Sequence, residues 1–293
     1  MSRFAMITML GVAAAVALMA AVPAQAALTS GLQGYWPFDG DGDDAAGSVN
    51  LTGSGTTGFG STSPIVGLYA TATAQTGGTG VNSEFSGNAG NFNIDATNNE
   101  VTIAGWLRYE AGSAGGGEAK ILAGLDSFRL NASVDVDAIG GQIYQYTGYV
   151  NTSDSTVVNS NDHGVTYDLN TWYHTVLKYE SDGHVEFWLG DTGDADLSLV
   201  EEWDRSNYKM PNMQDHAKFF AAHWEYKATN PGGTINVDEL ALWNRALTDI
   251  EAQELFDMGK AGTAIIPEPS SILLLGIGGT VGLLVLRSRR RRA

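Results

Sequence analysis

The sequence predicts an all-β domain, an antiparallel sandwich of two sheets, that ends in one short helix. Short segments of alternating apolar and polar residues recur about every 8–15 residues, which is typical of sandwich strands. Glycine-rich turns separate these segments, and the chain contains 37 glycines. Its 7 tryptophans and 11 tyrosines also favour strands over helices. No long helical periodicity appears before residue 248.

The two clearest strands are VTIAGWLRY at 101–109 and WYHTVLKY at 172–179. The turn at 181–183, Ser-Asp-Gly, joins the second of them to HVEFWLG at 184–190, so a hairpin is expected there. The alternation within each segment predicts one buried face per strand. Further strands are predicted at GLYATATA, FRLNASVDVDA, QIYQYTGYV, KFFAAHWEY and TINVDELALW.

One helix is predicted close to the end of the body. Thr248 and Glu251 form a capping box of the T-x-x-E type, which marks a helix start. Gly259 is expected to end the helix, because glycine is common just past a helix. The residues spaced to form its apolar face are Ala252, Leu255, Phe256 and Gly259.

The body of the chain is strongly acidic. Ten of the 16 basic residues and 32 of the 33 acidic residues lie in the span 27–264, whose net charge is therefore −22. A polyanion repels phosphate backbones, so nucleic acid is excluded as a partner, while divalent cations are favoured. The chain has no cysteine, which rules out disulfides, thiolate metal sites and a cysteine nucleophile.

The first 26 residues have the pattern of a secretory signal peptide. Arg3 gives the basic start, an apolar core follows, and Ala24-Gln25-Ala26 is a small-residue cleavage site. Signal peptidase is therefore expected to cut after Ala26, although an uncleaved N-terminal anchor is the alternative. The mature domain is expected to cover residues 27–262.

The residues 263–293 form a tail of different composition. Pro267-Glu268-Pro269 precedes an apolar run at 270–286, and an arginine-rich end follows at 287–293. The apolar run predicts a membrane-spanning helix, short at about 26 Å against a bilayer core of about 30 Å. The arginines behind it are expected to stay in the cytoplasm.

This tail resembles the PEP-CTERM sorting tail of exported proteins in Gram-negative bacteria that make extracellular polysaccharide. The resemblance implies recognition near Pro267, Glu268 and Pro269 by an exosortase, a membrane enzyme similar to a transpeptidase. The helix would then hold the protein in the inner membrane only transiently, before it reaches the cell surface or an extracellular biofilm matrix. An ordinary single-pass anchor is the alternative.

The body resembles the laminin-G-like jelly rolls of the concanavalin A-like lectin/glucanase superfamily. The resemblance covers residues 30–262 and implies a jelly-roll form of the predicted sandwich. It implies no particular activity. The matching segments are Trp36-Pro37-Phe38-Asp39, Asp44-Ala45-Ala46-Gly47, Trp106, Trp172-Tyr173-His174-Thr175-Val176, Asp238-Glu239 and Arg245-Ala246-Leu247.

The middle of the body departs from this pattern at 126–165 and 191–230, where a binding surface is expected. Aromatic side chains in or beside these stretches are candidates for stacking on sugar rings. Most aromatic residues of a sandwich belong to its core, which is the alternative for each of them, and the tryptophans at family core positions are expected to be structural. The candidate platform residues are Trp188, Trp203, Trp224, Tyr144 and Tyr146.

A calcium site is expected near the first strand. Four aspartates crowd the loop 39–44, and hard oxygen ligands at this density suit Ca²⁺. In related jelly rolls a calcium often bridges the first and last strands, which points to Asp39 and Asp238, with Asp44 and Glu239 as supporting residues. The alternative is a solvated loop whose aspartates form Asx-turns.

A catalytic pair is not evident. The E-x-D-x-x-E strand pattern of the superfamily's hydrolases is absent, and Glu186 beside His184, or Asp135 beside Asp137, would be the pairs to consider. The expected function is therefore an exported, non-catalytic surface or matrix protein that binds carbohydrate or another surface ligand. The alternatives are a glycoside hydrolase or lyase on the same fold, and a purely structural or adhesive matrix protein.

Overall fold

The fold is described from a computed structural model of the chain. The described residues are 27–47, 49–73, 83–88, 100–110, 118–123, 128–133, 138–139, 165–166, 170–204, 219–224 and 234–266, with the single residues 92, 94 and 168.

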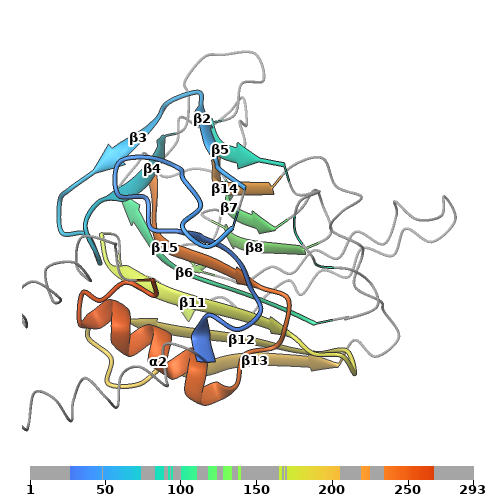
Figure 1. Ribbon diagram of the computed structural model, residues 1–293. Helices are drawn as coiled ribbons and strands as arrows, with labels where there is room; N and C mark the ends of the chain where they lie inside the picture. The colour runs from blue at the N-terminus through green and yellow to red at the C-terminus, as the bar shows by residue number, and fades with distance from the viewer. Residues whose placement is uncertain are drawn as a thin grey trace, which may run out of the picture.

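Two antiparallel sheets form the body, as the sequence predicts (Figure 1). The large sheet has eight strands in the order β13-β12-β11-β6-β15-β4-β3, with β1 paired to β15. The small sheet has the order β2-β5-β14-β7-β8, and β9 and β10 pair separately.

The strands of the large sheet are β1 (Leu32–Trp36), β3 (Thr57–Gly60), β4 (Tyr69–Thr73), β6 (Val101–Glu110), β11 (Trp172–Tyr179), β12 (His184–Asp191), β13 (Ser198–Asp204) and β15 (Thr234–Trp243). The remaining strands are β2 (Thr52–Ser54), β5 (Ser83–Gly87), β7 (Glu118–Ala123), β8 (Phe128–Ser133), β9 (Ala138–Ile139), β10 (Val165–Thr166) and β14 (Phe219–Trp224).

The large sheet is covered on both faces. Its inner face packs against the small sheet in one core, which includes Ile103, Leu177 and Phe85. Its outer face packs against the helix α2 (Asp249–Lys260) in a second core, which includes Trp106 and Phe256. Figure 1 shows α2 and the small sheet at opposite ends of the view, with the large sheet between them.

This second layer corrects the expectation of one buried face per strand. All eight residues of β11 are buried. Tyr173 and Leu177 join the core between the sheets, whereas Trp172 and Val176 join the core beneath α2. The alternation itself is as predicted, but the face expected to meet water is covered by the helix and by loops.

The hairpin expected at 172–190 is confirmed. The strands β11 and β12 pair in register from Tyr173 opposite Asp191 to Tyr179 opposite Val185. Gly183 has a φ of 91°, a left-handed conformation that favours glycine at this turn.

The helix begins as predicted and ends later. Both hydrogen bonds of the Thr248–Glu251 capping box are present. The helix runs past Gly259 to Lys260, so glycine does not end it. A Cβ atom on Gly259 would lie 2.2 Å from the Trp106 indole nitrogen, which means that glycine is needed there for close packing. The predicted apolar face is confirmed, because the buried residues of α2 are Ala252, Leu255, Phe256 and Gly259.

Strand β15 changes its neighbour halfway along. Its first residues, up to Val237, pair with β4, and its last residues, from Leu240, pair with β1. The pairing of β15 with β6 on its other edge shifts register between Asp238 and Ala241, which marks an irregularity such as a β-bulge. The change of neighbour therefore falls on Asp238 and Glu239.

Several predictions fall wholly or mainly outside the described residues: the signal peptide, the strand QIYQYTGYV, the pair Asp135 and Asp137, the motif at 267–269 and the membrane-spanning helix at 270–286. Among the residues that the structure describes, no helix is long and apolar enough to cross a membrane.

Candidate functional site

The change of neighbour along β15 gathers carboxyl groups into the protein interior. Asp238 is fully buried and Glu239 is 5% exposed. Glu239 has a φ of 52°, and Phe38, directly before Asp39, has a φ of 58°. Left-handed backbone at non-glycine residues is uncommon and concentrates at functional sites. The strained backbone and the buried carboxyl groups therefore lie at the same place.

Loop amides and one phenol bind these carboxyl groups. The Asp238 Oδ2 atom accepts hydrogen bonds from the backbone amides of Ile65, at 2.9 Å, and Val66, at 3.2 Å. The Tyr35 hydroxyl donates to Glu239 Oε2 at 2.5 Å. No strand that the structure describes pairs with this edge of β15 at Asp238 and Glu239, and their carboxyl groups accept hydrogen bonds from loop amides and Tyr35 instead.

Asp39 joins this cluster from the end of β1. Its Oδ1 atom accepts a hydrogen bond of 2.7 Å from the amide of Leu68, and its charge raises the pKa of both Asp238 and Glu239. The prediction that Asp39 and Asp238 lie close together agrees with this geometry.

One oxygen of each buried carboxyl group on β15 has no hydrogen-bond partner: Asp238 Oδ1 and Glu239 Oε1. Burial, with the charge of Glu239, raises the pKa of Asp238 to about 9. Burial, with the charge of Asp39, raises the pKa of Glu239 to about 8, although the Tyr35 hydrogen bond acts in the other direction. Unpartnered buried oxygens are costly, so they indicate a missing proton, water or cation.

The donor chemistry fits a hard cation, but the side chains alone do not enclose one. Over the described part of the chain, no three His, Asp or Glu side chains form a cluster that could hold a metal ion. Calcium takes 6–8 oxygens and accepts backbone carbonyls and water among them. A calcium ion at this point would depend mainly on such ligands.

Asp44 has a different role in the described structure. Its Oδ1 atom accepts hydrogen bonds from the amides of Tyr35, Ala46 and Gly47, and its Oδ2 atom accepts one from Val49. Four amide bonds to one carboxylate fix the loop after β1 against the strand. The Asx-turn alternative describes this residue well.

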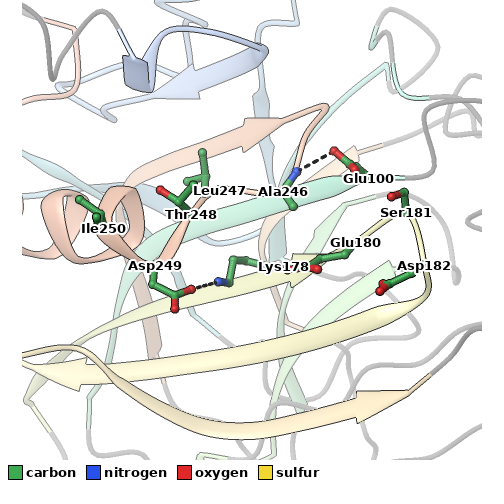
Figure 2. Close-up of a pocket in the computed structure, with 10 residues that line it drawn as sticks. All are labelled: Glu100, Lys178, Glu180, Ser181, Asp182, Ala246, Leu247, Thr248, Asp249 and Ile250. Atoms are coloured by element: carbon green, nitrogen blue, oxygen red, sulfur yellow. Dashed lines mark hydrogen bonds and ion pairs between the residues drawn. The ribbon is translucent and has the colours of Figure 1, made fainter.

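A second acidic site lies on the outer face of the large sheet, at the start of α2. It is an open pocket of about 600 Å³. Figure 2 shows the β11–β12 turn, with Glu180, Ser181 and Asp182, facing the β15–α2 connection across it. Glu100, at the start of β6, accepts a hydrogen bond of 3.4 Å from the amide of Ala246 on the same side.

The floor of this pocket is the buried ammonium group of Lys178. This side chain is 1% exposed and forms ion pairs with Glu186 and, at 2.6 Å, with Asp249. Its Nζ atom lies 4.9 Å from the centre of the Trp188 ring, and the Trp188 indole donates to Glu186 Oε2 at 2.8 Å. Every charge on the floor therefore has a partner.

The structure separates the predicted platform residues. Trp188, on β12, is half-buried beneath the pocket, and Trp203 follows on the neighbouring strand β13. Trp224 lies on β14 in the other sheet, and Tyr144 and Tyr146 fall outside the described residues. The tryptophans expected in the core are buried, namely Trp36, Trp106, Trp172 and Trp243.

Three side chains of these candidate sites were not predicted from the sequence. Lys178 carried a usable signal, since it occupies an alternate position on a face that is otherwise apolar or aromatic. Asp249, at the first position of α2, and Tyr35 carried none, because their partners lie 71 and 204 residues away in the chain.

Comparison with known families identifies the tail. A family model described as the PEP-CTERM protein-sorting motif matches residues 266–292. The chain carries a PEP-CTERM sorting motif. The predicted sorting tail with Pro267, Glu268 and Pro269 lies in this match, and such a motif indicates an exported protein. A search of curated proteins finds no match to the chain.

Solved structures identify the fold of the body. The binding domain of Paraclostridial Mosquitocidal Protein 1 matches with a TM-score of 0.56 and 14% identity, over 78% of this chain and 52% of that one. The binding domain of Botulinum Neurotoxin DC in complex with SialylT matches with a TM-score of 0.53 and 10% identity, over 79% and 52%.

A third match is a structure concerned with the dependence of botulinum neurotoxin type C cell entry on two ganglioside molecules. Its TM-score is 0.53 and its identity 10%, over 80% of this chain and 52% of that one. The PEP-CTERM chain thus spans about half the length of these structures. The likeness shows the fold alone, and it confirms the predicted lectin-like jelly-roll sandwich.

Proposed function

We propose that this chain is an exported, non-catalytic protein that binds carbohydrate at the cell surface or in the extracellular matrix of a Gram-negative bacterium. The observation that carries the proposal is a lectin-like sandwich with an open polar pocket, placed before a PEP-CTERM motif. Two structures of the same fold concern SialylT or gangliosides, which supports a glycan as the ligand class.

The pocket at the start of α2 is the proposed glycan site. Its carboxylates and hydroxyls offer acceptors and donors to sugar hydroxyl groups, and Trp188 lies beneath it. The lining carries Glu100, Glu180, Asp182 and Asp249 against Lys178, a net charge of −3. Neutral and amino sugars are therefore favoured, and sialic or uronic acids are repelled.

Glycan binding by the full chain in detergent tests this proposal. Neutral, amino and sialylated oligosaccharides are compared for the wild type, for Glu180→Gln with Asp182→Asn, and for the control Asp196→Asn, an exposed site on another loop. Binding of neutral or amino sugars that the double variant loses and the control keeps is expected. No glycan binding, or binding that survives in the double variant, would remove the pocket as the site.

A non-catalytic role agrees with the state of Glu186. Its carboxylate binds Lys178 and the Trp188 indole, and His184 lies 3.6 Å from its other oxygen. A carboxylate paired in this way is a poor general acid. The glycoside hydrolase or lyase alternative requires release of new reducing sugar ends that Glu186→Gln abolishes, and no release is expected.

A bound calcium ion near Asp39 and Asp238, supported by Glu239, remains part of the proposal, whereas both Asp44 oxygens are already occupied by backbone amides. The cation would balance buried negative charge and join the loop before β4 to the first and last strands. Terbium, a calcium substitute that nearby aromatic rings sensitise, tests it in a chain where Tyr35 already contacts Glu239. Sensitised emission that excess calcium removes is expected. If no emission is seen, the calcium site is ruled out, and a purely structural or adhesive matrix role would involve no metal.

Export is proposed to proceed by signal peptidase at the N-terminus and exosortase at the PEP-CTERM motif. The protein would be held in the inner membrane only until the second cut. Mass spectrometry of the extracellular product is expected to find a C-terminus near Pro267-Glu268-Pro269. A product that keeps its terminal arginines would favour the ordinary membrane anchor.

A further inference from the structure

A small cavity lies between α2 and the outer face of the large sheet. Its volume is about 10 Å³, and its walls include Trp106 of β6, His174 of β11, Glu239 of β15 and Gly259 of α2. Ile265, beyond the helix, also lines it. This cavity is distinct from the open pocket at the other end of the helix and is not used by the proposed glycan site.

Two buried polar atoms belong to the residues that line this cavity and have no partner: His174 Nδ1 and Glu239 Oε1. The two side chains belong to residues that are 3% and 5% exposed. Burial lowers the pKa of His174 to about 3, so its imidazole is neutral and has one acceptor nitrogen. Such atoms rarely stay unpaired in a folded interior.

We propose that this cavity is a built site for one internal water molecule, which hydrogen-bonds His174 Nδ1 and Glu239 Oε1. About 10–15 Å³ of this kind of volume is what a single water needs, and a buried water needs at least two polar partners. Water donates and accepts, so it satisfies Glu239 Oε1 whether or not that carboxyl group carries a proton. The cavity has no room for the 6–8 oxygens of a calcium ion.

The water completes a chain of contacts under the helix. Tyr35 donates to one oxygen of Glu239, and the water joins the other oxygen to His174. The strands β1, β15 and β11 are thereby linked beneath α2. Ile265 lines the cavity and is the last residue before the matched PEP-CTERM segment, so the proposed water lies where the chain leaves the domain toward its sorting motif.

A high-resolution crystal structure of the full chain, together with magnetic relaxation dispersion of the water signal in solution, tests the proposal. A single density peak within hydrogen-bond distance of both atoms is expected, and this water is one of the long-lived waters that the dispersion counts. In His174→Leu the peak is lost, the dispersion counts one long-lived water fewer, and amide exchange at 259–265 speeds up by about tenfold, the effect of one buried hydrogen bond. His184→Leu, on the next strand and half-exposed, keeps both.

Three results would overturn it. An empty cavity in the wild-type crystal structure is one, and a peak surrounded by five or more oxygens at about 2.4 Å, which marks a cation, is another. The third is an equal number of long-lived waters in the wild type and in His174→Leu. If that variant does not fold, the wild-type density decides alone.

Discussion

Two acidic sites on the large sheet differ in whether their buried ionisable groups have partners of opposite charge. At the outer pocket, Lys178 is buried and is paired with Glu186 and Asp249. At the change of neighbour along β15, Asp238 and Glu239 are buried with no cation beside them, and each keeps an unpartnered oxygen.

The difference indicates what each site needs from outside. The floor of the outer pocket is complete by itself, because Lys178 is paired with Glu186 and Asp249, so this site needs no ligand to keep its fold. The β15 site is incomplete until protons, water or a cation occupy it. The first site should therefore be stable without its ligand, whereas occupancy of the second should change stability strongly.

The largest effect is expected when the cation beneath the outer pocket, Lys178, is removed. Lys178→Met leaves the half-buried Glu186 without its cation, and loss of one member of a largely buried pair costs about 3 kcal/mol or more of unfolding free energy. Urea unfolding measures it. Asp249→Asn removes only the exposed partner and should cost under about 1 kcal/mol. Equal losses in the two variants would show that the buried pair is not what stabilises this site.

The pH dependence of stability tests the β15 site, at Asp238 and Glu239. Folded Asp238 and Glu239 keep their protons up to pH values of about 9 and 8, whereas unfolded carboxyl groups lose theirs near pH 4. The folded state therefore holds more protons, and the stability from these groups is lost as the pH rises toward those values. The lowered pKa of His174 has the opposite effect, because it makes stability rise with pH, but only below about pH 6.5.

From pH 6.5 to pH 8, unfolding free energy in chelator is therefore expected to fall by about 3 kcal/mol, because each group contributes up to about 1.4 kcal/mol per pH unit and less as the pH reaches its pKa. In Asp238→Asn the fall should be roughly half as large. A wild-type curve that is flat over this interval would mean that the two carboxyl groups are ionised in the folded state.

A smaller effect is expected where the helix meets the sheet. Gly259→Ala places a methyl group 2.2 Å from the Trp106 indole nitrogen, and overpacking of this kind costs about 2 kcal/mol. Thermal unfolding measures the loss. Helix propensity alone predicts the opposite result, that Gly259→Ala stabilises the protein. Ala252→Gly, also on the buried face of α2, is the comparison that separates overpacking from helix propensity.

The smallest change concerns the start of α2 beside the outer pocket. Thr248→Ala removes the side-chain cap and should cost about 1 kcal/mol. Thr248→Ser keeps the hydroxyl and should cost little. If the two variants unfold alike, the capping box does not contribute measurably to the position of Asp249 at the pocket.

Local patterns in the sequence were enough to predict much of the fold. The alternation in 172–179 and the capping box at Thr248 depend on neighbours in the chain, and both are confirmed. The end of the helix was predicted wrongly, because Gly259 is set by the distant ring of Trp106 rather than by the helix itself. A glycine has several uses, and its own sequence position does not distinguish them.

The candidate sites were less accessible to prediction. The proximity of Asp39 and Asp238 came from resemblance, since β1 and β15 lie at opposite ends of the chain. The pairing of Lys178 with Asp249 depends on α2 crossing the sheet, and the left-handed backbone of Glu239 depends on β15 exchanging one neighbour for another. Both are consequences of topology.

Calorimetric titration of calcium into the metal-free full chain at pH 7.5 tests the contrast between the two sites most directly. We expect one calcium ion for the wild type, at least about tenfold weaker binding by Asp238→Asn, and unchanged binding by Asp249→Asn. No heat and no shift in melting temperature with the wild type would contradict it. So would a loss of binding in Asp249→Asn, because the ion would then occupy the outer pocket.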